Sequence, residues 1–466
     1  MSSFDQGKPL RILFVNRMAS MERGGGETFD LEMIRHLVGL GCRVTLLTGH
    51  PLFGRAVLGP KDWWGQSEEG EDCRLQTVDC RLLGGDTGGS DGSTVYSLRS
   101  NVFSLRSPYT GWFPWDKVRG GWRLRAWDFS CFERAAARWV AARADEFDVV
   151  QVCELPELVS ELKRRAFPRP VVMRVTAPNV YDPTGGTQKA DAVIASGTSI
   201  AKYHAGPRPD CVEVPNGVDV TRFRPQATDF RIRHGIGPDE FVVLYVARFQ
   251  AFKNHAMLVE AFRLFRESLP AGAKARLVLV GSGPLRTRVE AQVAAAGLSQ
   301  SVLFLGEIMF AELPAIYAAS DLKAISSDYE SFCFAVIEAM ASGLPVVSTD
   351  CGWVPRLMGR GGGDGRLTMS DGPLAIGDCP SSLAHRPSPL AHRPSSIEPG
   401  GWITPVGDAP AFAAALREAW ENPDVRAAKG RANRLTAEER HTWTASARKL
   451  LDLYQRLCPV PVLPKA

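Results

Sequence analysis

Two series of apolar runs that alternate with helical patterns constrain the fold of this chain more than any other feature. The first series has an apolar run at 10–16, three glycines at 24–26, an amphipathic stretch at 27–40 and another apolar run at 43–47. This order predicts a strand–helix–strand unit with parallel strands. Later strand patterns of the series lie at 149–152, 171–175 and 192–195.

The second series starts near residue 241. Segments of helical length separate five apolar runs, at 241–246, 276–280, 302–305, 322–325 and 345–348. Two such series in 466 residues predict an α/β protein with two doubly wound, Rossmann-like domains, joined near 206–240. Helices are expected at 409–421 and 443–456, and the amphipathic pattern of the last one predicts that it packs on another element.

Two stretches break this alternation. Residues 50–130 do not follow it, and the glycine- and serine-rich segment 84–93 predicts a flexible loop. Residues 359–400 contain the repeat Leu-Ala-His-Arg-Pro-Ser at 383–388 and again at 390–395. A repeat of this composition does not bury a core, so we expect 359–400 to be a disordered insertion.

Bulk properties narrow the class of protein. The net charge of +4 is too small to indicate nucleic-acid binding by itself. Residues 1–9 lack the apolar core of a signal peptide, and no window is apolar for long enough to cross a bilayer. Ten cysteines are scattered without a Cys-x-x-Cys pair, which argues against a zinc site and a disulfide framework. We therefore predict a cytoplasmic protein without a nucleic-acid partner.

Two carboxylates, Glu330 and Glu338, stand eight residues apart in the second series. Glu330 ends a short polar loop, whereas Glu338 lies in an apolar, alanine-rich stretch that predicts a buried helix. A carboxylate in such a helix is costly unless it has a partner, and a ligand with several hydroxyls would be one. The N-terminus of the same helix would offer its free N–H groups to a phosphate. The layout therefore indicates a nucleotide-sugar site.

Two basic residues follow the first strand of the second series. Arg248 and Lys253 come after the run at 241–246, and ligands of open α/β sheets bind beyond the carboxyl ends of the strands. A guanidinium and an ammonium suit a diphosphate, and Asn254 would cap the next helix. Gly281 begins a turn after the following strand, where glycine lets a backbone approach a nucleobase or phosphate. Alone, each motif also fits a solvated turn; beside the two carboxylates they favour one site.

Taken together, these motifs resemble the family 4 retaining glycosyltransferases of the GT-B fold. The matching residues are Arg248, Lys253, the Gly-Ser-Gly-Pro turn at 281–284, Glu330, and the Glu-Ala-Met-Ala-x-Gly-x-Pro-Val-Val pattern at 338–347. The glycine loop at 24–27 and the segment 215–225 agree with the family as well. The likeness is strong over 210–355 and 400–457, fair over 9–48 and 140–200, and absent over 50–130 and 359–400.

The resemblance implies an α/β, GT-B architecture of two Rossmann-like doubly wound domains that face each other across a cleft. Residues 1–210 would form the acceptor-side domain, with 50–130 as a divergent insertion. Residues 211–440 would bind the nucleotide sugar, with 359–400 as an insertion. Residues 441–466 would hold a helix that crosses back to the first domain.

The resemblance also implies roles for individual residues. Arg248 and Lys253 would hold the donor diphosphate, and Glu330 would contact hydroxyls of the transferred sugar; these three form the expected catalytic set. Glu338 would accept hydrogen bonds from the ribose hydroxyls. The other expected donor-site residues are Gly281, Ser331, Phe332, Cys333, Phe334 and Asn216, and the acceptor side would use Gly25, Gly26 and Thr176.

The chain departs from the family pattern at four positions. Thr176 stands where the family commonly has a sugar-contacting histidine, and Ser331 and Cys333 replace two glycines of the phosphate turn. Arg356 replaces a glutamate, which would favour an acidic donor sugar, or would simply be a solvated surface arginine; we favour the second interpretation because arginine is mostly exposed.

The implied reaction is transfer, with retained configuration, of a sugar from a UDP- or GDP-sugar to an unidentified glycan, lipid-linked or small-molecule acceptor. Arg248, Lys253 and the helix after Ser331 would stabilise the charge on the leaving diphosphate. No Asp-x-Asp motif lies in a suitable loop, so we expect neither a metal nor another cofactor.

Residues 96–143 bear on the acceptor. They hold nine Arg or Lys, three Asp or Glu and five Trp. Basic residues with tryptophan suit an anionic membrane surface or a lipid-phosphate acceptor, which would place the protein at the inner membrane face. The competing interpretation, which we favour, is that these aromatics form local core or an acceptor pocket.

Two other functions compete with glycosyl transfer. The departures at Thr176, Cys333 and Arg356 would also fit a catalytically degenerate GT-B protein that binds a sugar nucleotide. A dinucleotide-dependent oxidoreductase would need Gly-x-Gly-x-x-Gly after the first strand, and the sequence at 24–29, Gly-Gly-Gly-Glu-Thr-Phe, lacks it.

Overall fold

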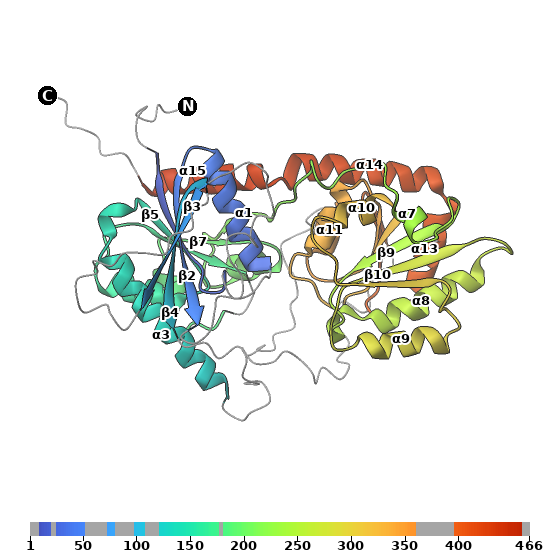
Figure 1. Cartoon of the computed structure of the whole chain (residues 1–466), viewed down its shortest axis with the longest axis horizontal. Helices are drawn as coiled ribbons and strands as arrows, with labels where there is room; N and C mark the ends of the chain where they lie inside the picture. The colour runs from blue at the N-terminus through green and yellow to red at the C-terminus, as the bar shows by residue number, and fades with distance from the viewer. Residues whose placement is uncertain are drawn as a thin grey trace. The chain divides into compact units, whose positions relative to one another are not determined.

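The computed structural model describes residues 9–19, 25–51, 72–79, 97–107, 121–176, 180–359 and 396–458. Within these residues the contacts divide the chain into two units. The first runs to Pro215 and includes the C-terminal segment from Trp443, and the second holds Asn216 to Thr442. Each unit is built on its own sheet (Figure 1).

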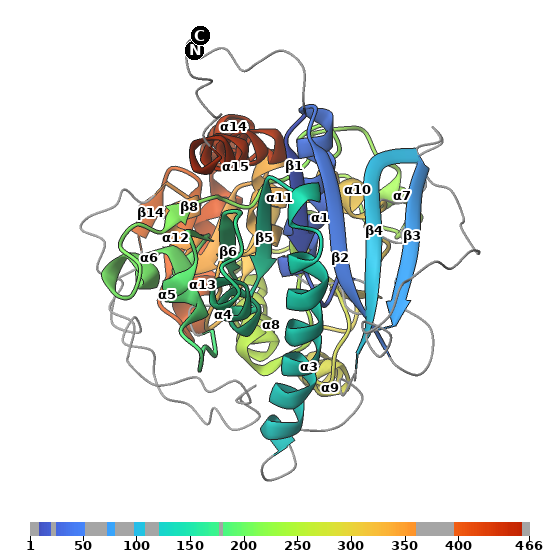
Figure 2. The ribbon, with the colours of Figure 1, turned by 90° about the vertical axis from the view of Figure 1, so that its left-hand side faces the viewer.

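The first sheet has the order β3-β4-β2-β1-β5-β6-β7-β8, and every neighbouring pair is parallel. Figure 2 shows β2, β4 and β3 side by side at one edge. The strands are β1 (Arg11–Val15), β2 (Arg43–Pro51), β3 (Asp72–Asp79), β4 (Ser97–Ser107), β5 (Val149–Cys153), β6 (Val171–Val175), β7 (Ala192–Ala195) and β8 (Val212–Glu213).

The helices of this unit lie between its strands, except for the C-terminal helix α15, which joins the unit from the end of the chain. They are α1 (Gly25–Gly39), α3 (Gly121–Ala141), η2 (Ala144–Glu146), α4 (Pro156–Arg164), α5 (Gly186–Lys189), α6 (Thr198–Ala205) and α15 (Trp443–Leu457). α15 packs on α1, with the rings of Phe29 and Trp443 at 6.1 Å. This contact confirms that the last amphipathic helix buries its apolar face against another element.

The second sheet has the order β11-β10-β9-β12-β13-β15-β14, parallel except for β14. Its strands are β9 (Phe241–Val246), β10 (Ala275–Val280), β11 (Val302–Gly306), β12 (Leu322–Ile325), β13 (Val346–Thr349), β14 (Ser396–Glu398) and β15 (Gly401–Thr404). Its helices are α7 (Phe230–Arg233), η3 (Ala251–Lys253), α8 (His255–Ser268), α9 (Arg286–Ala295), α10 (Leu313–Ala318), α11 (Phe334–Ala341), α12 (Val354–Leu357), α13 (Ala409–Glu421) and α14 (Pro423–Arg440).

The two sheets, parallel except for β14, confirm the predicted α/β class, and each predicted strand is present with ends that match or shift by a few residues. Two predictions need correction. The stretch 50–130 is expected to break the strand–helix alternation, but it contains β3 and β4, which extend the first sheet. The expected disorder at 359–400 is wrong at 396–400, where β14 pairs with β15. The loop 84–93 and the repeat at 383–395 lie outside the described residues.

Among the described residues, no helix combines the length and the apolar character that crossing a membrane would require.

Candidate functional site

An ion pair joins the connection after β9 to the loop after β12. Lys253 is the last residue of η3, and its Nζ donates to Glu330 Oε1 at 2.6 Å. Ser327, just after β12, donates its hydroxyl to the same oxygen at 2.6 Å. Because β9 and β12 are neighbours in the sheet, their carboxyl ends unite side chains that are 77 residues apart in sequence.

Both side chains of this ion pair are largely buried. The side chains of Lys253 and Glu330 are 18% and 9% exposed. Burial, the largest single cause, would lower the pKa of Lys253, but the surrounding groups, foremost the carboxylate of Glu330, together outweigh it, so the pKa lies above its ordinary value. Lys253 is therefore a cation at neutral pH, as binding of a diphosphate requires.

The second carboxylate, Glu338 of α11, has a partner on α10. The hydroxyl of Tyr317 donates to Glu338 Oε2 at 2.8 Å. Burial raises the pKa of Glu338, while the Tyr317 hydrogen bond and the charge of Lys323 oppose that rise. We expected a ligand to be the partner of this carboxylate. Tyr317 is a partner that the protein itself supplies to one of the two oxygens.

The turn between the carboxylates has an uncommon backbone conformation. Cys333 is the N-cap of α11 and adopts φ = 73°, in the left-handed region that glycine favours. Cys333 thus carries a side chain on a backbone conformation that glycine favours, at a position where the resemblance noted from the sequence implies a glycine. Burial, followed by the charge of Glu330, raises the pKa of the Cys333 thiol to about 12, so the thiol stays protonated at neutral pH. Ser331, Phe332 and Phe334 complete the turn.

Gly352 and Trp353 contact the backbone carbonyl of Glu330. Trp353 donates its N–H to the Glu330 carbonyl at 3.2 Å. At Gly352, with φ = 53°, an added Cβ would lie 1.7 Å from that carbonyl oxygen. The backbone of Glu330 is therefore fixed by a contact that only glycine permits. Nearby, Arg356 is exposed, and its guanidinium lies 4.6 Å from the centroid of the Trp353 ring.

Arg248 is exposed, two residues beyond the end of β9. Beside it, the backbones of two connections touch: a Cβ on Gly281 would lie 2.1 Å from the carbonyl oxygen of Ala247. The contact between the two strand ends therefore requires glycine at 281, and approach of this glycine to a ligand stays a prediction. Asn254 caps α8 as predicted, since its side chain accepts from the Met257 N–H at 3.2 Å.

Asn216 carries a buried acceptor. Its side chain is 4% exposed, and its Oδ1 has no hydrogen-bond partner in the described part of the chain. Two residues later, Val218 donates its N–H to the His441 carbonyl at 2.7 Å, and the His441 ring lies 6.3 Å from that of Phe332. The segment that carries Asn216 therefore runs close to the turn that carries Phe332. A buried acceptor of this kind calls for a donor such as a ligand hydroxyl.

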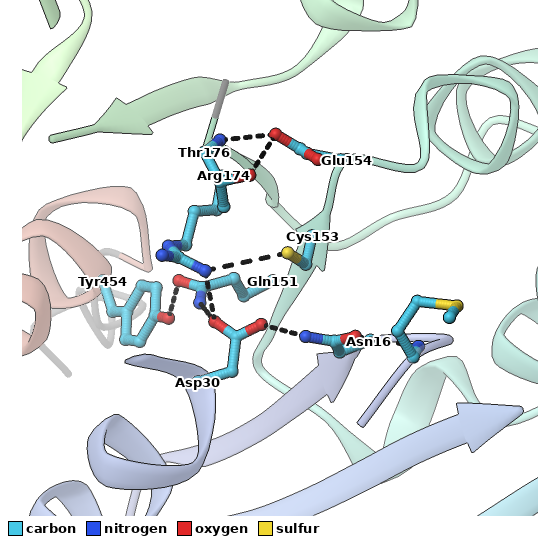
Figure 3. Close-up of polar contacts among 9 residues, drawn as sticks. Asn16, Asp30, Gln151, Cys153, Glu154, Arg174, Thr176 and Tyr454 are labelled. Carbon is cyan, nitrogen blue, oxygen red and sulfur yellow. Dashed lines mark hydrogen bonds and ion pairs between the residues drawn. The ribbon is translucent and has the colours of Figure 1, made fainter. Parts of the chain in front are cut away.

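In the first unit, Thr176 is bound to a carboxylate at the carboxyl ends of β5 and β6 (Figure 3). Its N–H donates to Glu154 Oε1 at 2.6 Å, and its hydroxyl donates to the same oxygen. Glu154 has φ = 52°, an uncommon value for a residue with a side chain. Gly25 and Gly26 form the first turn of α1.

Figure 3 also shows a second, buried polar network, which includes Arg174, two residues before Thr176. Asp30 of α1 is 1% exposed and accepts from Asn16 Nδ2 at 2.7 Å, from Gln151 Nε2 at 3.3 Å and from an Arg174 nitrogen at 3.4 Å. Tyr454 of α15 donates to Gln151 Oε1 at 2.5 Å. Burial raises the pKa of Asp30, and the charge of Arg174 opposes that rise. The network ties α1 and α15 to the strand ends.

Sequence reasoning missed several of these residues. Lys323, Tyr317 and Ser327 in the second unit, and Asp30 and Arg174 in the first, were not singled out. The available signal was a charged residue within an apolar strand pattern, as at 171–175 and 322–325. Among the described residues, no group of three or more His, Cys, Asp or Glu side chains is arranged to hold a metal ion. Metal independence stays a prediction.

Comparison with protein families gives a match that lies in the second unit. Residues 226–371 match the family of the glycosyl transferases group 1. That range contains Arg248, Lys253, Glu330 and Glu338. The D-inositol 3-phosphate glycosyltransferase of Salinispora arenicola is 35% identical over 183 residues, which cover 35% of this chain and 40% of that protein. The match thus spans less than half of the length of this relative.

Solved structures resemble nearly the whole chain. The sucrose-phosphate synthase of Thermosynechococcus elongatus has a TM-score of 0.65 at 19% identity, over 96% of this chain and 99% of its own. HepE of Anabaena, solved in complex with UDP, has a TM-score of 0.62 at 17% identity, over 96% and 100%. At these identities the likeness is one of fold, and the fold is GT-B.

Proposed function

We propose that this protein is a retaining glycosyltransferase of family 4 that moves a sugar from a nucleoside-diphosphate donor to an acceptor. The observation that carries the proposal is the buried Lys253–Glu330 pair at the carboxyl ends of adjacent strands, with Glu338 one helix turn beyond the same loop. A cation for phosphate and carboxylates for hydroxyls, at the ligand-binding edge of a parallel sheet, suit a nucleotide sugar.

In this proposal Lys253 and Arg248 bind the diphosphate, and Glu338 accepts from the ribose. An acceptor hydroxyl attacks the anomeric carbon as the bond from that carbon to the phosphate oxygen breaks. The leaving diphosphate takes the proton from the acceptor hydroxyl. Lys253, already charged, stabilises the negative charge that develops on the leaving group. Retention of configuration is tested by the NMR signal of the anomeric proton in the first product formed.

The donor is tested by a thermal-shift panel of UDP, GDP and their hexose derivatives. A ligand present at a hundred times its dissociation constant stabilises the folded state by about 2.7 kcal/mol. We expect one nucleotide series to raise the melting temperature in wild type and to fail in Lys253→Met. Arg288→Gln, which removes an exposed charge on α9, is the matched control and should respond as wild type. If no series shifts the wild type, the donor proposal is wrong.

Metal independence is part of the proposal. The charges of Arg248 and Lys253 would take the place of a divalent cation at the diphosphate. Turnover measured in excess EDTA should equal turnover with added Mg²⁺ or Mn²⁺. A loss of activity in EDTA that Mg²⁺ restores would contradict this point while leaving the donor site in place.

For the acceptor side we propose that residues 96–143 contribute local core or an acceptor pocket in a cytoplasmic protein, with contact to the inner membrane face as the competing interpretation. In this range Trp127 is 54% exposed and Leu124 is 37% exposed, both on α3, whereas Trp139 of the same helix is fully buried. Helix α3 is thus partly core and partly surface. Flotation with anionic and with neutral liposomes tests the membrane contact: salt-sensitive binding to anionic liposomes supports the contact, and absence of binding ends it.

A sugar-nucleotide-binding protein without turnover is the second candidate, because Cys333 places a side chain on a backbone conformation that glycine favours. It is distinguished by donor binding without donor hydrolysis or transfer to any acceptor. Restoring the family residue in Cys333→Gly would raise turnover if the cysteine limits the site.

A further inference from the structure

A lysine is buried inside the second unit, beneath the proposed donor site. Lys323 lies on β12, its side chain is 0% exposed, and its Nζ finds no hydrogen-bond partner among the described residues. An ammonium group removed from water without a partner is costly. A buried polar group left unsatisfied in a folded protein calls for a specific reason.

Two tyrosines flank this ammonium. Its nitrogen lies 5.3 Å from the centroid of the Tyr245 ring and 5.6 Å from that of Tyr317, within the range of cation–π attraction. The hydroxyl of each ring is bonded to a part of the donor site. Tyr245 donates to the backbone carbonyl of Lys253 at 2.6 Å, and Tyr317 donates to Glu338 Oε2 at 2.8 Å. One buried cation thus contacts both rings that hold the site.

Charged and titratable groups face Lys323 from each neighbouring element. They are Tyr245 of β9, Lys253 of η3, His255 of α8, Tyr317 of α10, Glu330 and Cys333 of the turn, and Glu338 of α11. The two carboxylates attract the ammonium and Lys253 repels it. Burial lowers the pKa of Lys323 to about 7, so a modest change of pH changes its charge.

We propose that Lys323 is a positioning residue of the donor site, which acts through Tyr245 and Tyr317 on Lys253 and Glu338 and adds positive charge beneath the bound diphosphate. The inference rests on the proposed function, because it takes a nucleoside diphosphate as the ligand. Lys323 itself is buried and does not touch the nucleotide. A core lysine without this role would destabilise the fold and leave nucleotide binding unaffected.

The test is a titration of UDP and of GDP by calorimetry at pH 6 and at pH 8.5. We use wild type, Lys323→Met, and Lys274→Met, which removes an exposed lysine before β10. At pH 6 we expect Lys323→Met to bind the preferred nucleotide roughly tenfold more weakly than wild type, the equivalent of one pKa unit of interaction. At pH 8.5 the difference should shrink, because Lys323 is then neutral in wild type. A change in the ionisation of the nucleotide between the two pH values affects wild type and variant alike, so it does not alter the ratio of their affinities.

A second variant separates positioning from general damage. Tyr317→Phe keeps the ring beside Lys323 but removes the hydrogen bond to Glu338, so it should weaken binding at both pH values with an intact melting transition. Equal affinities of wild type and Lys323→Met at pH 6, with a higher melting temperature for the variant, would overturn the inference alone. Failure of wild type to bind UDP or GDP at either pH would overturn the proposed function and this inference with it.

Discussion

Replacing Lys253 by methionine tests the energetics of the donor site. The change keeps the apolar stem and removes the ammonium that lies 2.6 Å from Glu330 Oε1. Removing one partner of a fully buried ion pair costs about 3–5 kcal/mol. Lys253 remains 18% exposed, so water takes up part of the loss. The Ser327 hydrogen bond to the same oxygen also remains. We therefore expect a loss of about 2 kcal/mol in unfolding free energy, within the range for hydrogen bonds to charged groups.

The assay is a double-mutant cycle in urea, completed by Glu330→Gln and by the double variant. Each single variant leaves one largely buried charge, that of Glu330 or of Lys253, without its partner, whereas the double variant leaves no unpaired charge. The double variant should therefore lose less stability than the sum of the singles, with a coupling of about 1–2 kcal/mol. Lys274→Met, an exposed lysine of the same unit, should lose less than about 0.5 kcal/mol.

Transfer of sugar provides the second readout of the same variant. If Lys253 stabilises the leaving diphosphate, Lys253→Met should lower turnover at least a hundredfold, about 2.7 kcal/mol of barrier. Additive stabilities in the cycle would show that the two side chains do not form the pair in solution. Near-normal turnover by Lys253→Met would remove this residue from the mechanism, whatever the cycle gives.

Three further results are expected. Glu338→Gln keeps the acceptor for Tyr317 but loses the charge, so nucleotide affinity should fall about tenfold in a calorimetric titration while stability holds or rises; unchanged affinity would remove Glu338 from the site. Gly352→Ala should lower the urea midpoint strongly and weaken donor binding, because its Cβ would meet the Glu330 carbonyl oxygen at 1.7 Å; a wild-type midpoint would contradict that contact. In the folded protein the Lys323 amine is neutral above about pH 7, whereas in the unfolded chain it stays protonated up to about its ordinary pKa of 10.5. The unfolding free energy should therefore rise by about 1.4 kcal/mol per pH unit between about pH 7 and pH 10.5 because of this group, and this group should cause no pH dependence below about pH 7. Equal pH slopes for wild type and Lys323→Met in urea titrations would contradict this assignment.

The fold was largely predictable because strands of parallel sheets are buried on both faces and read as continuous apolar runs. The runs at 241–246 and 322–325 became β9 and β12 without change of bounds. β3 was missed because its sequence, Asp-Cys-Arg-Leu-Gln-Thr-Val-Asp, mixes polar and apolar residues. α14 was missed because the helix is polar over most of its length.

The candidate site was predictable in its residue types and less so in its contacts. Glu330 and Lys253 could be proposed separately, but their pairing depends on β9 and β12 being neighbours in the sheet, which a single sequence does not specify. The sequence does not indicate that Tyr317 is the partner of Glu338, because 21 residues and a strand separate the two. Lys323 was read as part of an apolar strand, and only its burial without a partner distinguishes it.

A crystal structure with the nucleotide bound tests the central claim most directly. The account predicts the diphosphate within hydrogen-bond distance of Lys253 Nζ and the Arg248 guanidinium, with ribose hydroxyls donating to Glu338. A nucleotide bound elsewhere, with Lys253 still paired to Glu330 and remote from any phosphate, would contradict it.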